Sequence, residues 1–279
     1  MVRDILVPLQ FTGSDTAALE AAAALAVAHE AHVAVLATVS YPAPIASEWG
    51  MAASMISQAD FDGVLDSVRG AGEAAKRHVE RAGATCELRV VEVLLNWPEE
   101  AAALHARHAD IAVIGGPDRV APSARFNAFF SALLLDAGRP VLVVPPAGKL
   151  LVPPRRVVLA WQPRREPSRA IHDALPLLPR DARVDVLMLD PEVGESTHGQ
   201  QPGADIAAHL ARHGLQVQVV SLPREGRSTG AAIIDYAAQQ RADLVVMGGY
   251  GHSRWREQVL GGTTRAVLEQ ATMPVLFSH

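Results

Sequence analysis

Short apolar runs alternate along the chain with longer amphipathic segments. The runs are four to eight residues long and are bounded by polar or glycine-containing stretches, as is typical of strands buried in a parallel sheet. In the N-terminal half this pattern predicts strands over 5–9, 32–39, 87–94, 111–114 and 141–144, and helices over 15–30, 54–82, 98–107 and 123–137. Strands that alternate with helices form βαβ units, so we expect a parallel sheet with right-handed crossovers.

The same order of elements is found a second time. Residues 108–116 read HADIAVIGG and residues 241–249 read RADLVVMGG, an offset of 133 residues. ILVPLQ at 5–10 matches VVLAWQ at 157–162 with an offset of 152, so the first copy carries about nineteen more residues before its fourth strand. We expect this surplus between residues 41 and 81.

The second copy shows the same pattern. Its predicted strands are 156–161, 183–189, 215–221, 243–248 and 274–278, and its predicted helices are 167–178, 203–213, 228–240 and 254–271. Between the copies lie Pro145, Pro146, Pro153 and Pro154, and proline is disfavoured in helices and in central strands. We therefore predict two α/β domains, residues 1–146 and 155–279, joined by a short linker.

A glycine-rich segment follows the fourth strand of the second copy. Two residues separate Gly248 from Gly251, and nine residues separate Gly251 from Gly261. Glycines in such a turn let backbone N–H groups approach a phosphate, and the following helix adds a favourable dipole. The spacing resembles the signature of the universal stress protein family, G-x2-G-x9-G-[S/T].

The resemblance implies a fold, a pairing of the two copies and a ligand. Members of that family are doubly wound α/β domains of the adenine nucleotide alpha hydrolase type, with five parallel strands in the order 3-2-1-4-5. Single-domain members pair through the fifth strand, so the two fifth strands of this chain would meet antiparallel as an intrachain pseudo-dimer. Members often bind ATP, which makes an adenine nucleotide the expected ligand here.

In a sheet of this order, a ligand binds beyond the carboxyl ends of the strands, between the first and the fourth strand. The resemblance and this rule together give the predicted nucleotide-binding residues Ala160, Trp161, Gln162, Leu189, Gly248, Gly251, His252, Gly261, Gly262, Thr263 and Thr264. Arg254 and Arg265 are further candidates to face the phosphates. Trp161 has two open interpretations, because its ring suits either stacking on a base or filling an empty pocket.

Both copies depart from the family pattern. ATP-binding members usually carry Asp where this chain has Gln162, and a hydroxyl residue where it has Gly262. The first copy departs further. Although Gly115 is retained, Gln10 takes the Asp position and Asp118 and Ala128 replace the second and third glycines. Since a carboxylate repels a phosphate, we expect no triphosphate there and assign the first copy to completing the pseudo-dimer.

Composition narrows the classes of function. A net charge of −5 with no polybasic tract argues against non-specific nucleic-acid binding and against an anionic membrane surface. The single cysteine, Cys86, cannot form an intrachain disulfide, and the N-terminus lacks the layout of a secretory signal. We therefore expect a cytoplasmic protein.

Other chemical motifs are absent from the sequence. The dinucleotide fingerprint G-x-G-x-x-G does not follow the first strand, and neither the P-loop nor the G-x-S-x-G elbow occurs. His105 and His108 are followed by Asp110, which we interpret as a solvated helix end, so no metal site is predicted.

The sequence thus predicts a stress-response binding or regulatory protein that takes ATP in its second copy. The motif has no evident carboxylate base or magnesium ligands, so we expect at most slow hydrolysis. Two alternatives stay open: an interaction scaffold with a vestigial pocket, and a small-molecule carrier or enzyme that uses His252 and Trp161. The sequence also leaves the oligomeric state open, a homodimer included.

Overall fold

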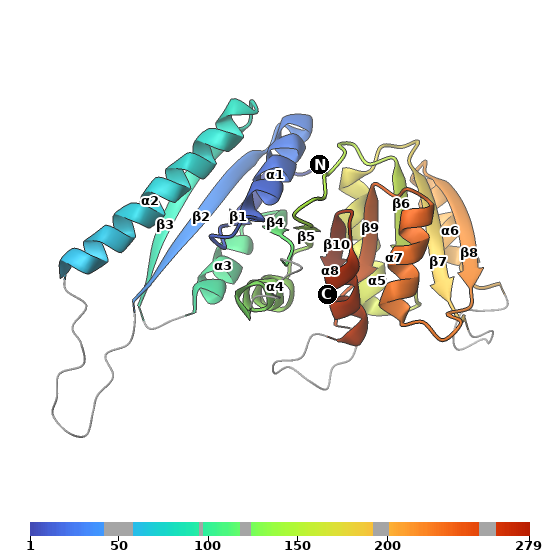
Figure 1. Ribbon diagram of the computed structural model, residues 1–279. Coiled ribbons are helices and arrows are strands. Elements are labelled where there is room, and N and C mark those ends of the chain that lie inside the picture. The colour runs from blue at the N-terminus through green and yellow to red at the C-terminus, as the bar shows by residue number, and fades with distance from the viewer. Residues whose placement is uncertain (42–57, 95–96, 118–123, 192–200, 251–260) are drawn as a thin grey trace, which may run out of the picture.

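The computed structural model of the protein describes residues 1–41, 58–94, 97–117, 124–191, 201–250 and 261–279. Strands and helices alternate throughout these residues (Figure 1). The elements of the first copy are β1 (Asp4–Pro8), α1 (Asp15–His29), β2 (His32–Tyr41), α2 (Gln58–Arg81), β3 (Thr85–Leu94), α3 (Pro98–Ala106), β4 (Ile111–Gly115), α4 (Ala124–Asp136) and β5 (Val141–Val144). Those of the second copy are β6 (Arg156–Ala160), α5 (Arg165–Ala174), β7 (Arg183–Leu189), α6 (Ala204–Arg212), β8 (Gln216–Leu222), α7 (Thr229–Gln239), β9 (Leu244–Gly248), α8 (Gly262–Gln270) and β10 (Val275–Ser278).

The strands form one ten-stranded sheet in the order β3-β2-β1-β4-β5-β10-β9-β6-β7-β8. Each half of this order is 3-2-1-4-5, and within each half all neighbouring strands are parallel. The two fifth strands pair antiparallel, with Leu276 opposite Leu142. The predicted fold class is therefore confirmed. Pairing of β5 with β10 also covers two apolar edges that would otherwise invite aggregation.

Most predicted boundaries agree with the structure to within a few residues, with two exceptions. Helix α8 begins at Gly262 whereas its predicted start is residue 254, and residues 251–260 lie outside the described residues. The helix predicted over 167–178 ends at Ala174 and continues as a 3₁₀ turn, Leu175–Leu177. Pro176 explains this change, because its ring nitrogen has no hydrogen to donate to the preceding helical turn. The extra length of the first copy includes α2, which has 24 residues whereas α6 has 9.

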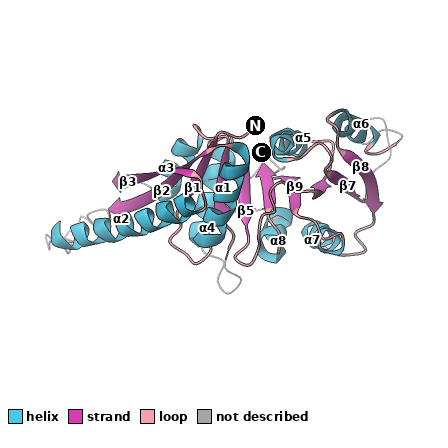
Figure 2. Cartoon of the chain, turned by 90° about the horizontal axis from the view of Figure 1, so that it is seen from above, coloured by secondary structure: helices cyan, strands magenta, loops and turns pink. Residues whose placement is uncertain are grey.

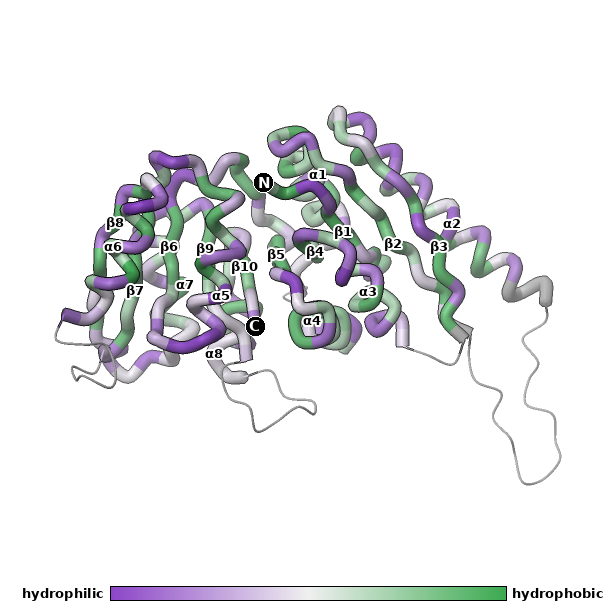
Figure 3. The backbone as a smooth tube through the Cα atoms, turned by 180° about the vertical axis from the view of Figure 1, so that it is seen from behind, coloured by the Kyte–Doolittle hydropathy of each residue, from purple (hydrophilic) through white to green (hydrophobic). Residues whose placement is uncertain are grey.

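Small apolar side chains fill the layers between the sheet and its helices. In the second copy, α5 and α6 lie on one side of the sheet and α7 and α8 on the other (Figure 2). One layer contains Ala22, Val79, Ile171 and Leu210, and the other contains Ala102, Leu133, Ile233 and Val267. The strands are mostly hydrophobic, while polar residues concentrate on helices and turns (Figure 3). Within the described residues no helix combines the length and apolarity needed to cross a bilayer.

Cys86 belongs to this framework rather than to a reactive site. It lies on β3 and is partly buried. Burial, with a smaller contribution from the nearby Glu80 carboxylate, raises the pKa of its thiol to about 11. The thiol is therefore protonated at neutral pH and behaves as a small apolar side chain.

Candidate functional site

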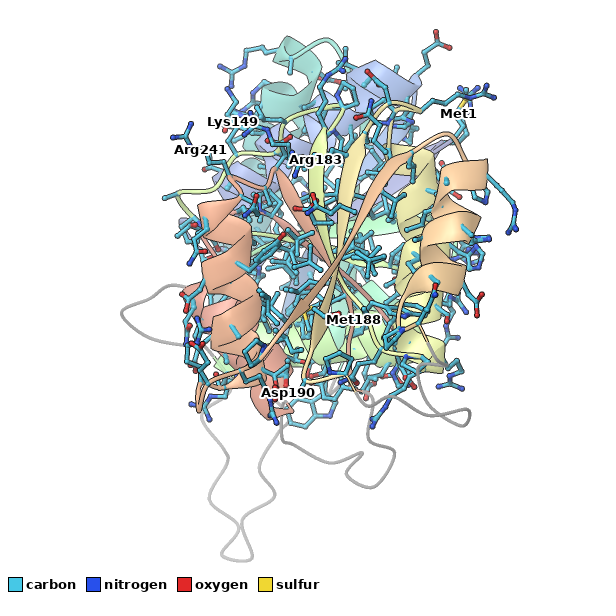
Figure 4. All side chains as sticks on the ribbon, turned by 90° about the vertical axis from the view of Figure 1, so that its right-hand side faces the viewer. Met1, Lys149, Arg183, Met188, Asp190 and Arg241 are labelled. Carbon is cyan, nitrogen blue, oxygen red and sulfur yellow. The ribbon has the colours of Figure 1, made fainter. Side chains whose placement is uncertain are left out.

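A cavity of about 660 Å³ opens at the carboxyl ends of the strands of the second copy. It lies where the strand order reverses, because β6 pairs with β7 on one side and with β9 on the other. Strand β7 runs from Arg183 to Leu189, and Asp190 marks its carboxyl end, opposite Arg183 (Figure 4). The cavity is lined by Ala160, Trp161, Gln162, Arg164, Glu166, Pro167, Leu187, Leu189, Thr229, Ile233, Met247, Gly248, Tyr250, Gly261, Gly262, Thr263 and Thr264.

The structure brings nine of the eleven predicted site residues together around this cavity. They are Ala160, Trp161, Gln162, Leu189, Gly248, Gly261, Gly262, Thr263 and Thr264. The other two, Gly251 and His252, lie outside the described residues, as does Arg254. Trp161 borders the open space without filling it, since the cavity remains beside its ring.

The glycines at the cavity are needed for two different reasons. A Cβ on Gly248 would lie 2.7 Å from the carbonyl carbon of Glu166 and the nitrogen of Pro167, so glycine here lets α5 approach β9. A Cβ on Gly261 or Gly262 would meet no atom of the described residues within 4 Å. Packing therefore explains Gly248, whereas Gly261 and Gly262 border open space that a ligand can approach.

Among the described residues, no side chain caps the backbone donors at the N-terminus of α8. Gly261 is the N-cap residue and provides no capping hydrogen bond. The first N–H groups of a helix have no acceptor within the helix, and together with the helix dipole they favour an anion. Since Gly261, Gly262 and Thr263 line the cavity, this end of α8 is suited to a phosphate group.

Two charged side chains line the cavity, Arg164 and Glu166. Arg164 is the N-cap residue of α5 and makes no ion pair with another described residue. The Glu166 side chain is only 13 % exposed, and its Oε1 lies 3.7 Å from the Nε of Arg165. Arg265, which we expected to face the phosphates, does not line the cavity; its Nε donates to Glu269 at 2.8 Å. That expectation is wrong, because the i, i+4 pair holds the guanidinium along α8.

The corresponding strand ends of the first copy are joined by a side chain. Gln10 is buried, and its Nε2 donates to the carbonyl of Gly115 at 2.9 Å, so it links the ends of β1 and β4. Beside it, the guanidinium of Arg125 lies 5.5 Å from the ring centre of Phe11 and 5.9 Å from that of Phe129. Asp118 lies outside the described residues, and Ala128 is part of α4.

Histidine and acidic clusters elsewhere do not resemble metal centres. Within the described residues, no three His, Cys, Asp or Glu side chains are placed to hold an ion. Burial and the neighbouring Arg89 guanidinium lower the pKa of His105, whose Nδ1 lies 3.4 Å from Nη1 of that arginine. A cation beside the ring disfavours a bound metal ion, so this helix end stays a structural feature.

Comparison with known proteins finds sequence similarity in the second copy. The sequence model of the universal stress protein family matches residues 169–279. A universal stress protein of Synechocystis sp. is 47 % identical over 87 residues, which are 30 % of this chain and 29 % of that protein. By sequence, the second copy of the chain therefore resembles the universal stress protein family. The match to this relative spans less than a third of the relative's length.

Solved structures extend the likeness in fold to both copies. A universal stress protein from Archaeoglobus fulgidus has a TM-score of 0.71 at 14 % identity, over 99 % of this chain and 95 % of that one. A protein of unknown function from Pseudomonas aeruginosa has a TM-score of 0.55 at 14 % identity, over 99 % and 92 %. At this identity the likeness concerns the fold alone. The first copy therefore shares the fold of the family, although the family sequence model matches only the second.

The sequence analysis did not predict eight of the described residues that line the cavity. They are Arg164, Glu166, Pro167, Leu187, Thr229, Ile233, Met247 and Tyr250. Tyr250 lies inside the glycine motif, and Thr229 follows Ser228, whose hydroxyl caps α7 by accepting from the N–H of Ala231 at 3.2 Å. The glycine motif and the helix cap could therefore have indicated Tyr250 and Thr229 from the sequence. The apolar residues carried no such signal, because which side of a strand faces a cavity depends on the helices that cover it.

Proposed function

We propose that this chain is a universal stress protein, a binding and regulatory protein that takes an adenine nucleotide, ATP in the first place, in the cavity of its second copy. The observation that carries the proposal is the coincidence of three features in one place. The cavity lies at the strand-order switch point, two glycines of the family signature, Gly248 and Gly261, line it, and the N-terminus of α8 borders it. An anionic ligand with an apolar base suits a cavity that combines backbone N–H donors with apolar walls.

Titration calorimetry of the full chain with ATP tests this proposal. We expect saturable heat with one ATP per chain, because Gln10 joins the strand ends of the first copy where a second site would lie. Two bound nucleotides per chain would contradict the expectation that the first copy binds no triphosphate. No heat at millimolar ATP would contradict nucleotide binding by either copy. In the second case an interaction scaffold becomes the better account. Mass spectrometry of co-purifying small molecules distinguishes a carrier of another ligand.

Glu166 supplies a carboxylate near the position where the family usually has Asp and this chain has Gln162. Both residues line the cavity, and the Glu166 side chain is mostly buried. Ribose hydroxyls and the adenine amino group are hydrogen-bond donors, which a carboxylate accepts more strongly than a neutral amide does. In our proposal Glu166 therefore binds the nucleoside part of the ligand.

A Glu166→Gln variant is expected to bind ATP about 10- to 100-fold more weakly, the usual cost of losing a hydrogen bond to a charged group. Adenosine should lose a similar factor, whereas inorganic triphosphate should bind no worse, because it has no nucleoside. Calorimetry with all three ligands measures the difference. The control is Arg165→Gln, which removes the exposed ion-pair partner of Glu166 and should change the affinity by less than about twofold. Equal ATP affinity in Glu166→Gln would place the nucleoside elsewhere.

A Gly262→Ser variant restores the hydroxyl that the family signature carries after its third glycine. The added Cβ meets no atom of the part of the chain that the structure describes within 4 Å. We expect ATP affinity to rise about 3- to 10-fold, the usual gain from one hydrogen bond. Gly262→Ala adds the same Cβ without the hydroxyl and serves as the control. An equal effect of the two variants on calorimetric affinity would exclude a phosphate contact by the serine hydroxyl.

A further inference from the structure

Tyr250, which lines the cavity of the second copy, is held by the first copy. Its hydroxyl lies 2.8 Å from the hydroxyl of Ser131 on α4. Its ring lies 6.4 Å from the ring of Phe130, also on α4, with an angle of 29° between the two planes. Phe130 in turn packs edge-on against Phe277 of β10 at 5.1 Å. Helix α4 lies beside β10 and α8 where the two halves meet (Figure 1).

The neighbouring Gly249 is fixed from the same side. A Cβ on Gly249 would lie 2.6 Å from Cδ2 of Leu134, again on α4. The N–H of Gly249 donates to the carbonyl of Ser278 at 2.9 Å, and its carbonyl lies 3.1 Å from Nδ1 of His279. The first part of the glycine turn is therefore packed between the end of β10 and a helix of the other copy.

The backbone of Tyr250 requires such support. Its φ is 54°, in the left-handed region that side chains other than glycine rarely adopt. A residue keeps this conformation only where its surroundings enforce it, and such residues cluster at ligand clamps. Burial raises the pKa of the Tyr250 hydroxyl, so this group stays protonated and keeps its hydrogen bond to Ser131 at neutral pH.

We infer that α4 of the first copy positions the glycine turn at the nucleotide cavity of the second copy, with Ser131, Phe130 and Tyr250 as the positioning residues. This inference rests on the proposed nucleotide binding. It gives the first copy a role that needs no ligand of its own, because the cavity wall at Tyr250 is complete only when α4 is in place. By linkage, a ligand that contacts Tyr250 also stabilises the contact between the two copies.

The test uses variants that each remove one hydroxyl and leave the surrounding atoms in place, Ser131→Ala and Tyr250→Phe. Each is expected to bind ATP about 3- to 10-fold more weakly, and the double variant no more weakly than either single one, because all three lose the same hydrogen bond. Tyr236→Phe is the matched control. It removes a tyrosine hydroxyl that donates to Asp185 at 3.0 Å in the same copy, away from the cavity lining, and should leave ATP affinity unchanged.

Amide hydrogen exchange in the ligand-free chain tests the positioning without any nucleotide. The N–H groups of 248–250 should exchange faster in Ser131→Ala and Tyr250→Phe than in the wild type, and at the wild-type rate in Tyr236→Phe. Unchanged exchange in the first two variants would overturn the inference whatever the ATP result. The inference would also be overturned if the wild type binds ATP and both variants bind it with the same affinity as the wild type. If exchange is faster in the two variants but the wild type does not bind ATP, the positioning by α4 is supported and the proposed nucleotide binding is rejected.

Discussion

An Ala160→Trp variant is expected to lose ATP binding by more than about 100-fold, equivalent to more than about 2.8 kcal/mol. Ala160 is the last residue of β6 and lines the cavity between β6, β7 and β9. An indole at this position would occupy space that the ligand requires. The fold should persist, because the side chain enters a cavity of about 660 Å³ rather than a packed core. Calorimetry with ATP measures the loss, and thermal unfolding checks the fold.

The control for this variant is Val27→Trp. Val27 lies on α1 of the first copy and is about half exposed, so a substitution there introduces the same indole without reaching the cavity. It should bind ATP as the wild type does. Unchanged ATP affinity in Ala160→Trp would show that the nucleotide binds elsewhere on the protein.

A Phe277→Ala variant is expected to reduce the free energy of unfolding by about 3–5 kcal/mol, the range for a buried phenylalanine. Phe277 lies on β10, is fully buried, and pairs with Val141 across the junction of the two copies. Its ring packs edge-on against Phe130 of α4 at 5.1 Å. Removing it leaves a cavity and deprives both copies of contacts. Denaturant unfolding followed by circular dichroism measures the change.

Phe11→Ala is the matched control for this prediction. Phe11 is 37 % exposed, and its described ring contact is the Arg125 guanidinium at 5.5 Å. A cation–π contact at such a site contributes about 0.5–1 kcal/mol, so the control should be only slightly destabilised. Equal loss of stability in both variants would mean that the junction of the copies is not part of the core.

The two copies, which are joined by the antiparallel pairing of β5 with β10, differ at the carboxyl ends of their first and fourth strands. In the first copy, Gln10 bonded to Gly115 joins the strand ends that a ligand would have to separate. In the second copy, the cavity lies between the corresponding strand ends, those of β6 and β9. The first copy is thus free to serve as a rigid partner, and α4 is the part of it that reaches the glycine turn.

Much of this arrangement was predictable from the sequence because it depends on local signals. Apolar runs and helical spacing located the strands and helices, and the repeated nonapeptides revealed the duplication. The family signature, read together with the switch-point rule, located most of the cavity wall. Ala160 and Gly262 are far apart in the chain, but each is tied to its own strand end or helix start, so each was found.

Only the tertiary structure decided the contacts between distant segments. Nothing in the sequence indicates that Glu166 lines the same cavity as Gln162, since the direction of α5 after β6 depends on how closely it packs on Gly248. Nor did it show that Arg265 pairs with Glu269 instead of facing the cavity. The contact of Ser131 with Tyr250 joins residues 119 positions apart in different copies. Periodicity and spacing describe neighbours along the chain, whereas such contacts exist only once the sheet has brought the two copies together.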